Sequence, residues 1–305
     1  MDELELANSF NRRRPQLRAV AYRILGSLSE AEDAVQETWL RLQRTEAEQI
    51  DSLDGWLTTV VARICLNMLR SRHTRGEQPL DGFRPEPIVD DPATGTDPEH
   101  EAMLADSVGI ALQVVLDTLS PAERIAFVLH DMFAVPFEEI ARMVERSPQT
   151  TRQLASRARR RVRDAAPTPD PDLTRQRAVV DAYFVAAREG DLEALTALLD
   201  PDVVLRSHRR DGDPHLLQGA AQVSRGAMRA RRYAPYVRPA LVNGAAGVVA
   251  FDGAQPFAVL AFTVVGDRVR AIDVFNDPEV VAKLDIGGSQ LERRLTGPES
   301  PVGAP

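Results

Sequence analysis

The chain has 305 residues and a formal net charge of −8 at pH 7. This length allows two or three small domains, and the negative charge argues against a protein that coats nucleic acid without selectivity. The single cysteine, Cys65, excludes an intramolecular disulfide and a metal site built from several cysteines. The sequence has no apolar run of membrane-spanning length and no apolar signal-peptide core near its start. We therefore expect a soluble cytoplasmic protein with no membrane contact, metal or cofactor.

Residues 1–76 are predicted to form the first helical domain. An apolar helical face covers Leu17–Leu25, and Gly26 then interrupts the pattern. Ser29 is expected to cap a second helix, which continues as AEDAVQETWLRL over residues 31–42. In that helix the small and apolar residues face inward at helical spacing. The polar residues on its outer side are Asp33, Gln36, Glu37 and Arg41.

A third helix is predicted from Gly55 to about Arg72, apolar at its start and basic at its end. Cys65 lies in this helix and is interpreted as a buried small hydrophobic residue. Residues 77–104 differ in character, because five prolines prevent long helices and eight acidic side chains accompany only Arg84. We interpret this stretch as an extended acidic linker, whose negative charge suits it to occupy a basic nucleic-acid channel. A merely solvated spacer is the alternative.

Residues 105–165 are predicted to form a second helical domain, which ends in a helix-turn-helix from Pro136 to Arg163. Ser147 suits the N-cap of the second helix, and Pro148 suits its first helical position. One face of that helix carries small residues for close packing, whereas the others carry arginines. In a recognition helix, uncharged polar side chains read base edges and arginines hold phosphates. The candidates are Gln149, Thr150, Arg152, Gln153, Ser156, Arg157 and Arg160. A solvated, charged helix at the end of a domain is the alternative interpretation.

A second linker, residues 166–173, leads to a block of a different type at 174–286. Helices are predicted at 174–189 and 192–199. The β-rich segments that follow are Val203–Ser207, Gly247–Phe251, Phe257–Val265 and Arg268–Phe275. Helices followed by several strands indicate that this third block is an α+β domain with a curved sheet. The predicted fold of the whole chain is therefore multidomain, with two all-α domains followed by this α+β domain. Residues 287–305 are rich in Gly, Pro and Ser and are expected to be disordered.

The first two blocks together resemble the sigma-70 superfamily in its small, extracytoplasmic-function form. Residues 31–42 look like the region 2.2 helix, and WLTTVVARICLNMLRSRHTR at 56–75 looks like regions 2.3 and 2.4. LSPAERIAFVLHDMFAVPFEEIARMVERSPQTTRQLASRARRRVR at 119–163 looks like region 4. A bare helix-turn-helix occurs in many repressors, so the order of the three segments carries the resemblance.

The resemblance implies an RNA polymerase subunit for promoter recognition and transcription initiation, rather than an enzyme. Its partners would be promoter DNA and core RNA polymerase, through the β′ coiled coil and the β flap. The region 2.2 residues that would dock on polymerase are Asp33, Gln36, Glu37 and Arg41. The residues that would contact the −10 element are Trp56, Arg63, Asn67, Arg70 and Arg72. The helix-turn-helix candidates named above would contact the −35 element. Glu145 stands where many relatives have a turn glycine, and we expect it to adopt a left-handed conformation.

The third block resembles the SnoaL-like branch of the NTF2-like superfamily. The resemblance lies in VVDAYFVAAREGDLEALTALLDPDVVLRS (179–207), NGAAGVVAF (243–251) and FAVLAFTVVGDRVRAIDVFNDPEVVAKL (257–284). Domains of this branch have a cone-shaped fold. A sigma factor fused to such a domain resembles the SigJ-type subgroup, whose members carry one motif in the linker and two motifs in the fused domain. The corresponding residues here are Phe83, Pro85, Glu86, Pro87, Asp211, Gly212, Asn276 and Pro278. The resemblance implies that the third domain regulates the sigma domains through them.

Some relatives of such cones are cyclases or isomerases that use an Asp or a His as acid or base. The candidates here are His208, Asp211, His215 and Asp273. Asp273 alternates with Ile272 and Val274, so it lies on the opposite face of its strand from those two. Regulation is the leading hypothesis for this domain and we assign no catalytic residue. The alternative is a DNA-binding regulator whose cone senses a small-molecule ligand or acts as an enzyme.

Overall fold

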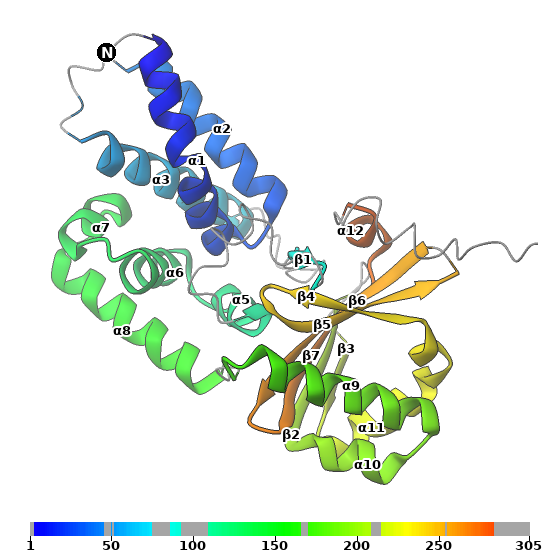
Figure 1. Cartoon of the computed structure of the whole chain (residues 1–305). Helices are drawn as coiled ribbons and strands as arrows, with labels where there is room; N and C mark the ends of the chain where they lie inside the picture. Colours follow the sequence, from blue (N-terminus) through cyan, green and yellow to red (C-terminus); the bar gives the residue numbers. More distant parts are fainter. Residues whose placement is uncertain are drawn as a thin grey trace, which may run out of the picture. The chain divides into compact units, whose positions relative to one another are not determined.

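The computed structural model describes residues 3–45, 50, 52–74, 86–92, 109–165, 170–208, 215–253 and 255–283. They divide between two units. The first contains helices α1–α3 and α5–α8, and the second contains the sheet with helices α9–α12 (Figure 1). Within the described ranges, no helix is both long and apolar enough to cross a membrane.

Three helices open the first unit: α1 (Glu3–Leu25), α2 (Leu28–Gln43) and α3 (Leu53–Thr74). They pack together through the apolar faces that the periodicity predicts. On α2 the buried residues are Ala31, Ala34, Val35, Thr38 and Leu42. Cys65 on α3 is fully buried, as expected, and burial raises the pKa of its thiol far above the usual range.

The junction between α1 and α2 corrects the predicted cap. Gly26 adopts φ of 74°, a left-handed conformation that glycine takes without strain, and this ends α1. The N-cap of α2 is Ser27, whose side chain accepts a hydrogen bond from the Glu30 amide at 3.3 Å. The assignment of Ser29 was wrong because α2 begins directly after the glycine turn, which places Ser29 inside the first helical turn.

The second half of this unit contains α5 (Gly109–Asp117), α6 (Pro121–Phe127), the π-helical turn η2 (Val128–Met132), α7 (Phe137–Val144) and α8 (Pro148–Ala165). The α7–α8 pair is the predicted helix-turn-helix. Its turn contains Glu145 at φ 57° and ψ 48°, the left-handed conformation expected there. Ser147 caps α8 by accepting from the Thr150 amide at 3.1 Å.

Two buried side chains join the two halves of the helical unit. Arg124, which is 3% exposed, donates from Nε to Leu116 O at 2.8 Å and from Nη1 to Ile24 O at 3.0 Å. Gln113 donates from Nε2 to Tyr22 O at 2.8 Å. Ile24 lies in the last turn of α1, where carbonyl groups have no partner within the helix, whereas Tyr22 O also accepts from the Gly26 amide at 2.7 Å. Residues of α5 and α6 therefore add hydrogen bonds to the end of α1.

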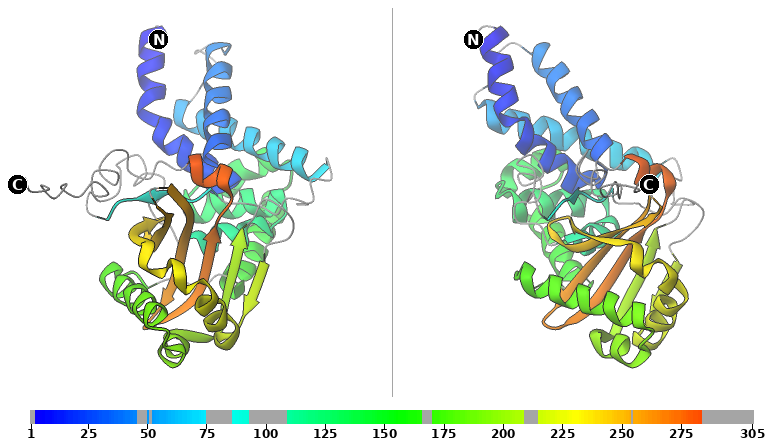
Figure 2. Two further views of the ribbon diagram at one scale, coloured as in Figure 1. Left: turned by 90° about the vertical axis from the view of Figure 1, so that its right-hand side faces the viewer. Right: turned by 45° about the vertical axis from the view of Figure 1, so that its right-hand side comes forward.

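The second unit is built on a seven-stranded sheet with strand order β1-β4-β5-β6-β7-β2-β3. All neighbouring strands are antiparallel except β2 and β7, which run parallel. The strands are β1 (Val89–Asp90), β2 (Leu199–His208), β3 (His215–Gln218), β4 (Val237–Val242), β5 (Ala245–Asp252), β6 (Gln255–Val265) and β7 (Arg268–Phe275). Figure 2 shows β2 and β3 beyond β7 at one side of the sheet.

Helices cover one face of this sheet: α9 (Leu173–Glu189), α10 (Leu192–Leu198) and α11 (Ala220–Ala230), with the 3₁₀ helix η3 (Arg231–Tyr236) after α11. A short α12 (Pro278–Lys283) follows β7. The core beneath α9 contains Tyr183, Phe184 and Phe262, whose ring centroids lie 5.3 to 5.9 Å apart in edge-on contacts. Interlocked rings, rather than an open hollow, occupy this part of the cone.

The four predicted strand segments all lie within observed strands. The sequence prediction lacked β1, β3, β4 and α11. The correction at β1 matters most, because it lies in the segment that we expected to be a linker. Residues Ile88, Val89 and Asp90 are at most 7% exposed, so this part of the acidic stretch is folded into the sheet instead of being a solvated spacer.

Candidate nucleic-acid and protein interfaces

The exposed side of α8 carries the predicted DNA-contacting residues. Thr151, Ala155 and Ala158 are fully buried and hold the helix against its neighbours. The opposite side exposes Gln149, Arg152, Gln153, Ser156, Arg157 and Arg160, with Thr150 half-buried beside Ser147. The fold therefore brings all seven predicted residues onto an accessible surface, in an arrangement that suits a DNA groove.

Ion pairs separate the arginines of α8 into two classes. Arg152 pairs with Glu138 at 2.6 Å, and Arg159 pairs with Asp131 at the same distance. Arg161 pairs with Glu123 at 3.2 Å. Arg157 and Arg160, in contrast, form no ion pair with any carboxylate in the described ranges. These two guanidinium groups can bind phosphate without first breaking an internal contact.

The outer side of α2 carries the predicted polymerase-docking residues. Asp33, Gln36 and Arg41 are exposed, and Glu37 is partly exposed. Glu37 accepts from Arg41 Nε at 2.9 Å in an i,i+4 pair, which contributes a few tenths of a kcal/mol to the helix. Leu40, at 38% exposed, adds an apolar side chain to the same surface. The four predicted residues thus lie together on one solvent-facing side.

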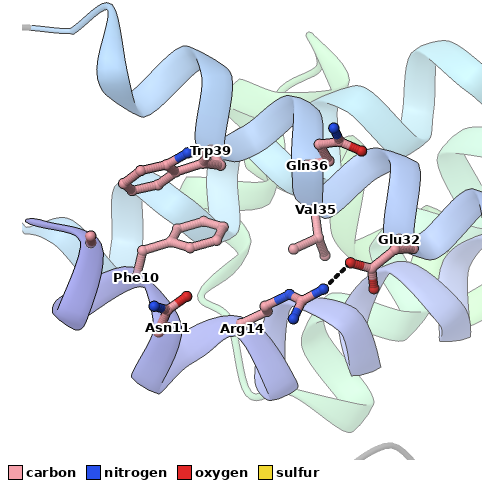
Figure 3. Close-up of a pocket in the computed structure, with 8 residues that line it drawn as sticks. Phe10, Asn11, Arg14, Glu32, Val35, Gln36 and Trp39 are labelled. Carbon is pink, nitrogen blue, oxygen red and sulfur yellow. Dashed lines mark hydrogen bonds and ion pairs between the residues drawn. The ribbon is translucent and has the colours of Figure 1, made fainter.

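A groove beside this surface, about 450 Å³ in volume, lies between α1 and α2. Phe10 and Trp39 form one end of it, with ring centroids 5.0 Å apart, and an ion pair between Arg14 and Glu32 borders the other (Figure 3). Gln36 also lines the groove. The sequence prediction missed the α1 residues because their helical spacing alone does not tell which of them meet α2.

The predicted −10 residues on α3 separate into two groups. Arg63, Asn67 and Arg70 are exposed and follow one another at i, i+4 and i+7, so they lie on one face. Arg72 is instead paired with Glu30 and donates from Nη1 to Leu25 O at 3.4 Å, and these contacts turn it toward the protein.

Trp56 is half-buried near the start of α3. Arg63, although exposed, donates from Nη2 to Arg142 O at 3.3 Å, a carbonyl of the first helix in the helix-turn-helix. The −10 candidates therefore do not form a single open surface in this arrangement of the helical unit.

Glu86, from the predicted linker motif, contacts the start of α2. Its carboxylate accepts from the Leu28 amide at 2.7 Å and from the Ser29 amide at 3.3 Å. Its own backbone carbonyl accepts from Tyr22 Oη at 2.8 Å. A carboxylate at the first turn of a helix is favourable because the amide dipoles point toward it. Glu86 thus supports the helix that carries the predicted docking residues.

The residues directly after Glu86 belong to the sheet unit. Ile88 donates its amide to Asn243 Oδ1 at 2.9 Å, and the Asn243 amide donates to Ile88 O at 2.8 Å. Val89 and Asp90 then pair with β4. Asn243 holds this bridge at φ of 50°, a conformation that Asn tolerates better than most residues.

The remaining regulatory candidates are only partly visible. Phe83, Pro85, Asp211 and Gly212 lie outside the described residues. Pro87 is buried, Asn276 is half-buried, and Pro278 is exposed at the start of α12. Asp277 accepts from the Glu279 amide at 2.9 Å and so caps α12.

Asp273 lies in a buried charged cluster on the sheet. Arg206 donates to it from Nε at 2.7 Å and from Nη2 at 2.9 Å, and His208 Nε2 lies 3.0 Å from Oδ1. The His208 ring stacks on Phe275 at 4.7 Å. Burial alone would raise the pKa of Asp273, but the hydrogen bonds from Arg206 and His208 and their charges outweigh it and hold the pKa below its usual value.

This cluster lies on the face of β7 opposite Ile272, which packs in the core with α9, as the alternation predicts. Both Asp273 oxygens are occupied by protein groups. Of the other acid–base candidates, His215 is exposed at the start of β3 and Asp211 lies outside the described residues. The geometry is that of a structural ion-pair cluster.

Known proteins share both the sequence segments and the fold. Residues 10–75 match the family model for Sigma-70 region 2, and residues 110–162 match that for Sigma-70 region 4. The ECF RNA polymerase sigma factor SigJ of Mycobacterium tuberculosis is 37% identical over 95% of this chain and 96% of its own length. The probable ECF RNA polymerase sigma factor SigI of that organism is 34% identical over 88% of this chain and 93% of its own.

The crystal structure of M. tuberculosis SigJ superposes with a TM-score of 0.74 at 34% identity, covering 92% of this chain and 99% of that one. Similarity thus extends through the helical unit and the fused SnoaL-like domain. The chain belongs to the extracytoplasmic-function (ECF) RNA polymerase sigma factors of the sigma-70 family.

Proposed function

We propose that this sigma factor docks on core RNA polymerase through the outer side of α2 and the adjoining groove. Asp33, Gln36 and Glu37 offer acceptors for a basic partner, and the aromatic groove offers an apolar recess next to them. Interfaces are strongest where an apolar centre is surrounded by polar contacts. The observation that carries the proposal is the exposure of this whole side within a segment matched by the region 2 model.

In the proposed complex, the exposed residues of α8 contact the −35 element, and Arg63, Asn67 and Arg70 of α3 contact the −10 element. Capture of unpaired bases costs a few kcal/mol of unstacking. Binding energy from polymerase would offset that cost, which is consistent with a chain that has net negative charge. We further propose that the fused domain is not an enzyme but regulates initiation.

The linker supports the regulatory part of this proposal. Glu86 binds the first turn of α2, whereas Ile88 to Asp90 extend the SnoaL-like sheet. Only Pro87 lies between these two sets of contacts. We therefore expect that release of strand β1 from the sheet would also loosen the contact between Glu86 and α2. A ligand-sensing cone is the competing function, and the interlocked rings of Tyr183, Phe184 and Phe262 favour regulation by the protein contacts instead.

Docking can be tested by co-purification with core polymerase. The variant Asp33→Ala/Gln36→Ala/Glu37→Ala should lose core binding while its helical content is unchanged. A matched control, Glu189→Ala/Gln222→Ala/Glu193→Ala, removes similar side chains from exposed positions of the SnoaL-like domain and should bind core normally. Equal core binding by both variants would refute the docking surface.

Regulation can be tested by run-off transcription with core polymerase on promoter DNA selected from a random library. We expect the full-length chain and a truncation after Ala165 to initiate with different efficiency. Identical transcription by both would refute a regulatory role of the fused domain, without affecting the docking proposal.

A further inference from the structure

The SnoaL-like domain contains a stretch whose charge is opposite to that of the whole chain. Between Pro214 and Phe251 the sequence has five arginines but no Asp or Glu. The stretch covers β3, α11, η3, β4 and nearly all of β5. Since the chain has a net charge of −8, this concentration of positive charge is a local property of the fused domain.

Three of these arginines lie along α11 and the 3₁₀ helix that follows it. Arg225 and Arg229 are four residues apart and share one face of α11, and Arg232 follows in the first turn of η3. All three are exposed, whereas Val223 and Ser224 are buried against the domain. With a rise of 1.5 Å per residue in an α-helix, Arg225 and Arg229 are about 6 Å apart along α11. We call the set the α11 arginine row.

The α11 arginine row is available for an external anion. None of its members forms an ion pair with a carboxylate in the described part of the chain. Arg232 lies over the ring of Tyr233, 4.6 Å from its centroid, and donates to Tyr233 Oη at 2.7 Å. Tyr233 in turn packs on Phe257 at 4.9 Å. Arg232 is thus ordered in advance, which lowers the entropy lost on binding.

Other arginines of the domain behave differently. Arg175, Arg206 and Arg270 pair with Asp170, Asp273 and Asp200, respectively. These three arginines, unlike the α11 arginine row, are held by carboxylates of the same domain.

We propose that the α11 arginine row binds the phosphate backbone of duplex DNA, as a contact additional to α8. Guanidinium groups match phosphate geometry, and three exposed ones close together along the chain suit the closely spaced phosphates of a duplex. Single strands are bound mainly by successive exposed aromatic rings. Here Tyr236 is 59% exposed but Tyr233 is covered by Arg232, so duplex is the better fit. This inference goes beyond the proposed function, which assigns DNA contacts to the helical unit alone.

The test measures binding of the full-length chain to a fluorescent duplex of random sequence, about 40 base pairs long, without polymerase. Anisotropy titrations from about 50 to 200 mM salt give the affinity and its salt dependence. The variant Arg225→Ala/Arg229→Ala/Arg232→Ala should bind about tenfold or more weakly, and the slope of log K against log salt should fall by about 3, because each lost phosphate contact removes about 0.9.

Two further variants make the result specific. Arg175→Ala/Arg188→Ala/Arg268→Ala removes the same charge elsewhere on the domain and should leave the slope near that of the unaltered chain. Arg225→Lys/Arg229→Lys/Arg232→Lys retains the three positive charges, so its slope of log K against log salt should be close to that of the unaltered chain. The proposal is overturned if the alanine row variant and its control have equal slopes. It is also overturned if the row variant loses binding to a single strand of that sequence but not to the duplex, or loses only core polymerase binding.

Discussion

Arg124 Nη1 donates to the carbonyl oxygen of Ile24 at 3.0 Å, and this bond joins region 4 to the last turn of the first region 2 helix. The same guanidinium binds Leu116 O and Asp117 Oδ1, so every side of it is occupied. Burial lowers the pKa of Arg124, and the neighbouring charge of Asp117 partly offsets that effect. The two regions are therefore connected by a residue that is costly to remove.

Replacement of Arg124 by Met should lower the free energy of unfolding by about 3 to 5 kcal/mol. The substitution preserves much of the side-chain length but leaves two backbone carbonyls and Asp117 without their donor. Urea denaturation followed by circular dichroism would measure the loss. Arg146→Met, at an exposed position of the same half of the unit, is the control and should change stability by less than about 0.5 kcal/mol. A loss no larger than the control's would mean that the bonds of Arg124 contribute little.

The two classes of arginine on α8 predict different effects on DNA binding. Arg157→Ala/Arg160→Ala should reduce the salt slope of promoter binding by about 2, since both groups are free to meet phosphates. Arg159→Ala/Arg161→Ala removes the same charge from arginines that are paired with Asp131 and Glu123, and should reduce the slope less. Filter binding of holoenzyme to promoter DNA at several salt concentrations distinguishes them. Equal reductions would indicate a diffuse charge effect instead of specific contacts.

Local sequence signals determine α8 far more completely than they determine β1. The recognition helix could be predicted because Ser147, Pro148 and the small-residue face are local signals that agree with one another. Strand β1 could not, because Val89 and Asp90 follow a proline-rich acidic stretch and pair with β4, about 150 residues later in the chain. The contacts of Arg72 and Arg124 were likewise invisible, since a sequence does not tell which arginine will meet an orphan helix carbonyl.

Asp273 predicts a specific acid dependence of stability. Its pKa is lower in the folded chain than in the unfolded chain, where an aspartate titrates near pH 3.9. The stabilisation is therefore fully present above about pH 4 and is lost as the pH falls through the lower folded-state value. Asp273→Asn should be less stable than the unaltered chain near pH 7, and the difference should shrink only below about pH 4. Urea denaturation at several pH values would check this. A difference that shrinks between pH 5 and 7 would contradict this assignment to Asp273.

The linker strand depends on Asn243, and this dependence can be isolated by two substitutions. Asn243→Gly tolerates the left-handed φ of 50° but removes the acceptor for the Ile88 amide, whereas Asn243→Asp retains both an acceptor and tolerance of that conformation. A buried amide without a partner costs about 1 to 3 kcal/mol. Amide hydrogen exchange of a peptide spanning residues 86–92 should therefore accelerate by roughly tenfold or more in Asn243→Gly and little in Asn243→Asp.

A transcription assay can test whether strand β1 takes part in regulation. If strand β1 restrains the sigma domains, Asn243→Gly should shift run-off transcription in the same direction as truncation after Ala165, whereas Asn243→Asp should not. Asn243 lies in the SnoaL-like domain and bonds Ile88, two residues after Glu86, which binds α2, so the segment from Glu86 to Asp90 is the route that this comparison tests. If amide exchange is faster in Asn243→Gly but transcription is unaltered, the stability of strand β1 does not affect initiation. The strand would then have a structural role without a regulatory effect.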